Sequence, residues 1–114
     1  KDIKIKGAKI LILGITFKEN CPDVRNTKVV DVIAALKEYD TNITIYDPWA
    51  NEVEVKHEYG LDSLREIPKD TFDTIVLTVA HNEFKNIDLS IFKKENAVIY
   101  DVKGVLNENV DGKL

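Results

Sequence analysis

Four short runs of apolar and β-branched residues, separated by longer stretches of mixed polarity, constrain the fold of this chain more than any other feature. The runs are AKILILG at 8–14, ITIY at 43–46, DTIVLTV at 73–79 and AVIYD at 97–101. Each run has the length of a strand rather than of a helix. Apolar runs of this kind are typical of strands that are covered on both faces. The sequence therefore predicts four buried strands.

The segments between these strands carry helical patterns. Apolar residues recur at helical spacing across 26–39, with charged residues on the opposite side, and Asn26 or Thr27 can cap the start of this helix. Weaker patterns predict helices at 50–57 and 63–67, and one or two short helices within 82–94. We interpret residues 15–27 as a long loop that runs into the first helix, and the chain after Lys103 as a loop and terminus.

Strands joined by segments of ten or more residues need crossover connections, which join parallel strands. A parallel sheet has helices on both faces, and right-handed crossovers give it a doubly wound, Rossmann-like form. A length of 114 residues fits one domain with a core of its own. We therefore expect a single α/β domain.

Composition narrows the possible partners. Sixteen Lys and Arg against twenty Asp and Glu give a net charge of −4, which disfavours nucleic acid as a partner. No apolar run is long enough to cross a membrane. The single cysteine, Cys21, fits a reducing compartment, and we expect a cytoplasmic protein. The chain lacks methionine and begins with Lys1, so we expect a piece of a longer polypeptide.

The loop after the first strand is the most informative candidate site, because ligands of parallel sheets bind beyond the carboxyl ends of the strands. A G-x-G-x-x-G fingerprint would provide a backbone cradle for a pyrophosphate, but only Gly14 is present. Lys18 and Arg25, seven residues apart, can supply positive charge by side chain instead. The alternative is that both are solvated surface cations.

Other residues near the carboxyl ends of the predicted strands each have two possible roles. Phe17 can stack on a base or close the core beneath the loop. Asp47 after the second strand is either a ribose-binding acid or a turn residue. His81 can titrate near neutrality, although a local hydrogen-bonding role is the more common one. Asp101 and Lys103 can meet a ligand or pair with each other.

Nothing in the sequence predicts a catalytic residue or a metal site. Lys18 and Arg25 near Cys21 would lower the pKa of a thiol, but His57 and His81 are far away in sequence, so a positioned base is missing. No cluster of His, Cys, Asp and Glu has metal-ligand spacing.

Three motifs in a fixed order give the chain a family resemblance. They are G-x-x-F-K from Gly14 to Lys18, D-x-R from Asp23 to Arg25, and Y-D-P from Tyr46 to Pro48. Together with the segments 78–81 and 100–103 they resemble the C-terminal, UDP-binding domain of the UDP-glucose/GDP-mannose dehydrogenase family over nearly the whole chain. Within this family, the chain is most similar to the branch that acts on UDP-N-acetylhexosamines for capsule and O-antigen polysaccharides. The segments that carry this similarity are FKENCPDVRNTKVVD and YDPW.

The resemblance implies an NAD-dependent oxidation of the sugar C6 hydroxyl to a carboxylate. In that family an N-terminal domain holds NAD, and an upstream segment carries the catalytic cysteine. Neither the N-terminal domain nor the central dimerisation helix is expected in this chain, so the resemblance implies an inactive fragment of an enzyme that is a homodimer when full length.

The resemblance also assigns roles by position. Phe17 and Lys18 match residues that contact the UDP-sugar, and Arg25 matches the arginine that reaches NAD. Lys103 stands where many members have an arginine near the substrate, which keeps the charge but not the planar fork. The alternative function is a non-catalytic Rossmann-like regulatory or assembly module that binds no nucleotide.

Overall fold

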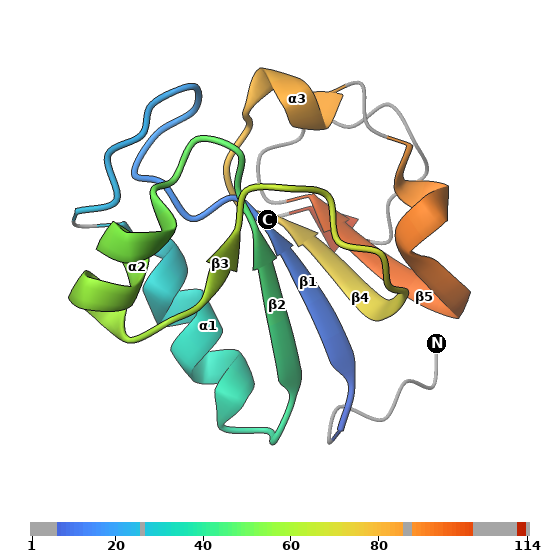
Figure 1. Cartoon of the computed structure of the whole chain (residues 1–114). Coiled ribbons are helices and arrows are strands. Elements are labelled where there is room, and N and C mark those ends of the chain that lie inside the picture. Colours follow the sequence, from blue (N-terminus) through green and yellow to red (C-terminus); the bar gives the residue numbers. More distant parts are fainter. Residues whose placement is uncertain (1–6, 26, 86–87, 102–111, 114) are drawn as a thin grey trace.

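One parallel sheet forms the centre of the computed structural model, which describes residues 7–25, 27–85, 88–101 and 112–113 (Figure 1). The strand order is β3-β2-β1-β4-β5-β6, and every pairing among the described strands is parallel. The strands are β1 Lys9–Leu13, β2 Asn42–Tyr46, β3 Ser63–Leu64, β4 Phe72–Leu77, β5 Lys93–Asp101 and β6 Gly112–Lys113. The predicted parallel α/β sheet and its four main strands are confirmed.

Alternate residues of β1 face two different hydrophobic clusters, as expected for a strand covered on both faces. Ile10 and Ile12 pack with α1 (Val29–Lys37) and α2 (Glu52–Tyr59), which lie on the same side of the sheet in Figure 1. Leu11 and Leu13 pack with the short helix α3 (Asn82–Lys85) and the 3₁₀ turn η1 (Leu89–Phe92). The sheet is therefore a middle layer between two helical layers.

The two long helices begin where hydroxyl or amide side chains satisfy their first backbone N–H groups. The N-cap residue of α1 is Lys28, whose side chain makes no capping bond, and not Thr27 as predicted. The hydroxyl of Thr27, one residue earlier, still accepts a hydrogen bond from the Val29 N–H at 3.2 Å and so supports the first turn. Asn26, the other predicted cap, lies outside the described residues. Asn51 caps α2, and Gly60 ends it with a φ of 67°. The described residues contain no helix long and apolar enough to span a lipid bilayer.

The helix predicted at 63–67 is wrong. Ser63 and Leu64 instead form β3, which pairs in parallel with the end of β2. Leu64 and Ile67 are 40% and 48% exposed, so they do not form the apolar stripe that stabilises a short helix. The proline at position 68 also disfavours helical backbone at Ile67.

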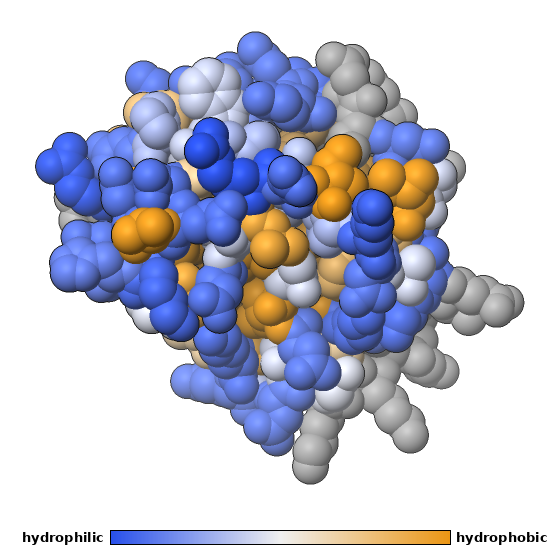
Figure 2. Space-filling model, in the orientation of Figure 1, coloured by the Kyte–Doolittle hydropathy of each residue, from blue (hydrophilic) through white to orange (hydrophobic). Residues whose placement is uncertain are grey.

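The terminal segment departs from prediction as well. Gly112 and Lys113 pair with Tyr100 and Asp101 and form β6, where the sequence analysis predicts only loop after Lys103. β5 begins at Lys93, four residues before the apolar run that predicts it. The apolar pattern does not mark these first four residues because they are polar. On the face drawn in Figure 2, most of the side chains are hydrophilic, and a few hydrophobic spots lie between them.

The turn after β1 depends on Gly14. Its φ is 102°, and a Cβ built there would lie 2.5 Å from the Val79 Cβ. The Gly14 N–H donates to the Tyr46 carbonyl at 3.0 Å, and the Thr78 hydroxyl donates to the Gly14 carbonyl at 2.6 Å. Glycine therefore lets the ends of β1, β2 and β4 meet at one point of the rim.

Candidate functional site

Asp47, directly after β2, lies at the centre of the rim and is fully buried. Its Oδ2 accepts hydrogen bonds from the backbone N–H groups of Ile15 and Thr16 at 2.7 and 3.1 Å. Its Oδ1 accepts from those of Trp49 and Ala50 at 2.8 and 3.1 Å. One side chain therefore ties the loop after β1 to the turn after β2. This confirms the interpretation of Asp47 as a turn residue.

His81, which follows β4, completes the surroundings of Asp47. It is also fully buried, and its Nε2 lies 3.0 Å from Asp47 Oδ2. Burial acts to raise the pKa of Asp47, but the hydrogen bond from His81 and those from the backbone of Ile15 and Trp49 outweigh it and hold the pKa below its usual value. Asp47 is therefore an ionised acceptor in a polar core, and His81 has the local hydrogen-bonding role predicted for it.

The first half of the loop, residues 15–20, is fastened at several points. The Thr16 hydroxyl donates to the Lys18 carbonyl at 3.0 Å, and the Phe17 N–H donates to the Asp23 carbonyl at 2.7 Å. The Asn20 N–H donates to His81 Nδ1 at 2.9 Å. Between these bonds the side chain of Phe17 is 59% exposed and Lys18 is exposed. The alternative of Phe17 as a core residue is therefore wrong.

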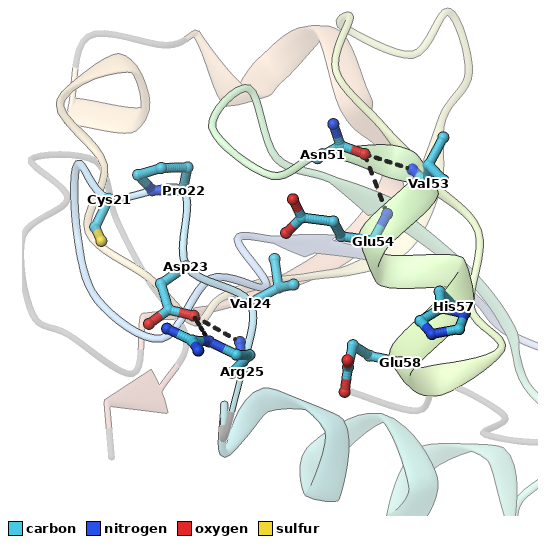
Figure 3. Close-up of a pocket in the computed structure, with 10 residues that line it drawn as sticks. All are labelled: Cys21, Pro22, Asp23, Val24, Arg25, Asn51, Val53, Glu54, His57 and Glu58. Atoms are coloured by element: carbon cyan, nitrogen blue, oxygen red, sulfur yellow. Dashed lines mark hydrogen bonds and ion pairs between the residues drawn. The ribbon is translucent and has the colours of Figure 1, made fainter.

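The second half of the loop, residues 21–25, faces α2 across a hollow of about 640 Å³ (Figure 3). Arg25 lies at this hollow, with its side chain 76% exposed. Lys18 is not among the residues that line it, so the structure does not bring these two cations into this hollow together. The lining consists of ten residues: Cys21, Pro22, Asp23, Val24, Arg25, Asn51, Val53, Glu54, His57 and Glu58.

Charge in the hollow is mainly negative. Asp23, Glu54 and Glu58 contribute carboxylates, and Arg25 is the arginine among the lining residues. The Arg25 backbone N–H and the guanidinium Nε bond to Asp23 Oδ1 at 2.9 and 3.2 Å. These two bonds lower the pKa of Asp23, the backbone bond more than the side-chain bond. A hollow with this balance of charge is not a cradle for a polyanion.

The arrangement at Arg25 fits one contact to a dinucleotide. The pairing with Asp23 uses Nε, so the two terminal nitrogens keep the fork that matches a phosphate. The backbone around Gly14 does not replace the missing glycines of a pyrophosphate loop, because the Ile15 and Thr16 N–H groups are already bonded to Asp47. The described residues of this loop therefore do not form a backbone cradle for a pyrophosphate.

Cys21 and His57 line the same hollow although they are distant in sequence. Figure 3 shows them at opposite ends, Cys21 on the loop and His57 on α2. Cys21 is a half-buried free thiol. That Cys21 is not a nucleophile stays a prediction. Among the described residues, no group of three or more His, Cys, Asp or Glu could hold a metal ion.

Two predicted residues are not tested by this geometry. Lys103 lies outside the described residues, and only the backbone of Asp101 is described, at the end of β5.

The sequence did not indicate Thr16 and Asn20 as site residues, although both bond to His81, across 65 and 61 residues of sequence. No local motif marks such residues, because their partner comes from a distant strand end.

The comparison with protein families agrees with the resemblance in the sequence. Residues 11–108 match the UDP-glucose/GDP-mannose dehydrogenase family, UDP binding domain. This match covers well over half of the chain.

Individual relatives point the same way. The chain is 43% identical over 109 residues to the UDP-N-acetyl-D-glucosamine 6-dehydrogenase of Salmonella typhi, a match that covers 93% of this chain and 26% of that protein. It is also 43% identical over 110 residues to the protein of that name in Pseudomonas aeruginosa, covering 94% and 26%. The solved UDP-N-acetyl-mannosamine dehydrogenase Cap5O from S. aureus superimposes with a TM-score of 0.70 at 25% identity, over 94% of this chain and 25% of that one. The chain thus spans about a quarter of the length of these relatives.

Proposed function

The chain belongs to the UDP-glucose/GDP-mannose dehydrogenase family, as its UDP-binding domain, and from this premise we propose that the loop after β1 holds the uridine diphosphate of a UDP-sugar. The observation that carries the proposal is the fastening of residues 15–20. Hydrogen bonds hold the backbone of Thr16, Phe17 and Asn20, while the side chains of Phe17 and Lys18 are exposed. The loop backbone is then largely ordered before the ligand arrives, which lowers the entropic cost of binding.

Phe17 and Lys18 have complementary roles in this proposal. The exposed ring of Phe17 offers an apolar surface against the nucleotide. The ammonium of Lys18 meets the diphosphate as a point charge, which needs no glycine-rich backbone around it. From the family resemblance we also propose Lys103, which lies outside the described residues, as a second substrate-binding cation.

We further propose that the longer protein is an NAD-dependent UDP-N-acetylhexosamine 6-dehydrogenase of polysaccharide synthesis in the cytoplasm, and a homodimer. The named relatives, UDP-N-acetyl-D-glucosamine 6-dehydrogenases, support the substrate class. The nicotinamide of NAD would accept hydride from the substrate carbon that is oxidised. Within this chain Arg25 would contact NAD through its terminal nitrogens, and residues elsewhere in the longer protein would supply the remaining contacts.

The test is calorimetric titration of this chain with UDP. We expect weak binding, in the millimolar range or somewhat tighter, because the chain contributes one wall of the site. Lys18→Ala should weaken binding about tenfold, since a hydrogen bond to a charged group contributes about 1.5–3 kcal/mol. Lys37→Ala is the matched control, because this exposed lysine ends α1 just before β2, at the amino ends of the strands and away from the loop after β1. This variant should bind UDP like the wild type.

Two results would contradict the proposal. Wild-type chain that takes up no UDP at millimolar concentration would favour the alternative, a regulatory or assembly module. Equal binding by the wild type and Lys18→Ala would remove Lys18 from the site. The chain alone should also form no NADH from UDP-N-acetyl-D-glucosamine, as followed by absorbance, and measurable turnover would show that its own residues suffice for the oxidation.

A further inference from the structure

We propose that His81 is a positioning residue for the UDP-binding loop, because one buried ring bonds to both ends of the segment that carries Phe17 and Lys18. Its Nε2 lies 3.1 Å from Thr16 Oγ1, before that pair, and its Nδ1 lies 2.9 Å from the Asn20 nitrogen, after it. The inference rests on the proposed function, since it concerns how the same two side chains are presented.

The direction of each bond follows from its donors. The Asn20 N–H can only donate, so His81 Nδ1 accepts and the ring hydrogen is on Nε2. The Thr16 hydroxyl hydrogen goes to the Lys18 carbonyl, so the hydroxyl oxygen is free to accept from Nε2. Asp47, as a carboxylate, accepts from the same Nε2–H at 3.0 Å. A continuous path of hydrogen bonds therefore runs from Asp47 through His81 and Thr16 to the backbone of Lys18.

The ring has little freedom to adopt another orientation. It is fully buried, stacked on Trp49 at a centroid distance of 6.0 Å and an angle of 24°, and tilted against Phe84 at 5.4 Å. Asn20 has a φ of 54°, and its side chain accepts a hydrogen bond from the Asn82 N–H at 2.9 Å. The far end of the segment is therefore fixed to the residues that follow β4, and the ring transmits that position to both ends.

Two conservative variants separate the roles of the two ring nitrogens of His81. The amide of glutamine reaches the place of Nε2, so His81→Gln keeps a donor for Asp47 and leaves the Asn20 N–H without its acceptor. The amide of asparagine reaches only the place of Nδ1, so His81→Asn keeps an acceptor for Asn20 and leaves Asp47 without its side-chain donor. A purely structural histidine would make affinity and stability fall together in both variants.

The positioning role predicts that the two variants rank in opposite orders: His81→Gln is the weaker in UDP affinity, and His81→Asn is the weaker in thermal stability. UDP affinity should fall more in His81→Gln, roughly fivefold, than in His81→Asn, because one hydrogen bond to the loop contributes about a tenfold factor at most. The thermal unfolding midpoint should fall more in His81→Asn, because the buried carboxylate of Asp47 then loses its side-chain hydrogen-bond donor. Lys37→Ala again serves as the control that changes neither quantity.

A measurement without ligand tests the geometry directly. In the ¹⁵N-labelled wild-type chain, a scalar coupling through the hydrogen bond should connect the backbone nitrogen of Asn20 with His81 Nδ1. The amide hydrogen of Asn20 should also exchange with solvent more slowly in the wild type than in His81→Gln. The coupling is measured on the wild type alone, so it is available even if both variants fail to fold.

The outcomes distinguish this inference from the proposed function. If the wild type binds UDP through Lys18 and the two His81 variants rank in the same order for UDP affinity and thermal stability, the positioning role is wrong and the proposed function stands. If the wild type binds no UDP, the proposed function is wrong, and the coupling and exchange measurements still decide whether His81 orders the loop. An absent coupling together with equal exchange rates would overturn the inference by itself.

Discussion

The two halves of the loop after β1 are held in opposite ways. Residues 15–20 are bonded to buried polar groups, Asp47 and His81, that come from the ends of other strands. Residues 21–25 line an open hollow, and their charged pair, Asp23 with Arg25, is formed within the same turn of chain. Each half is bonded to one carboxylate whose pKa is lowered, Asp47 for residues 15–20 and Asp23 for residues 21–25, yet the surroundings of the two carboxylates are different.

The difference teaches where the stability of the rim is located. Asp47 is enclosed and accepts from four backbone N–H groups and from His81, so each partner would be left unsatisfied without it. Asp23 is bonded to an arginine whose side chain is 76% exposed, and water can replace that contact. The backbone of the first half is therefore held by buried polar groups of the folded core, whereas the charged pair of the second half is open to solvent.

The largest effect is expected from removal of the buried carboxylate. Asp47→Ala should lower the free energy of unfolding by about 3–5 kcal/mol, because breaking a buried, hydrogen-bonded charge leaves uncompensated partners behind. Denaturant titration followed by far-UV circular dichroism measures this change.

Asp23→Ala is the matched comparison in the exposed half. Its unfolding midpoint should coincide with that of the wild type, since an exposed ion pair contributes little. Equal losses in the two variants would mean that the halves are not distinct, and that the Asp23–Arg25 turn is needed to keep the loop folded.

A second, smaller effect sharpens the comparison at the point where the loop begins. Gly14→Ala should lower the free energy of unfolding by about 3 kcal/mol, from the strain at a φ of 102° and the close approach of the new Cβ to Val79. At Gly60, which ends α2, φ is 67° but no atom lies within 4 Å of a new Cβ, so Gly60→Ala is the comparison. It should cost about 1 kcal/mol from backbone strain alone. Equal losses by denaturant titration would show that packing against Val79 is not what requires a glycine at position 14.

The comparison also marks how far the sequence predicts this molecule. Apolar runs predict β1, β2, β4 and the core of β5, because burial on both faces imposes a local pattern that the sequence retains. β3 and β6 were not predictable in this way, since each is two residues long and depends on a neighbouring strand for its pairing.

The site divides along the same line. Local motifs point to the whole loop, including Phe17, Lys18 and Arg25. They do not indicate that His81 contacts the loop at both Thr16 and Asn20, because that arrangement exists only after β1 and β4 have paired. The ionised state of Asp47 likewise depends on partners from three strand ends and not on the Asp-Pro dipeptide itself.

The smallest effect is a dependence of stability on pH that belongs to the buried half. The folded state holds the pKa of Asp47 below its unfolded value of about 3.9. As the pH falls through that value, the unfolded chain takes up a proton before the folded chain does, so unfolding becomes more favourable. The stability that Asp47 contributes is therefore complete above about pH 5 and is lost as the pH falls toward the lowered pKa of the folded state. Unfolding free energies of the wild type and Asp47→Asn, measured from pH 5 downward, should converge on acidification. A gap that widens instead would mean that burial raises the pKa of Asp47 more than its five hydrogen-bond donors lower it.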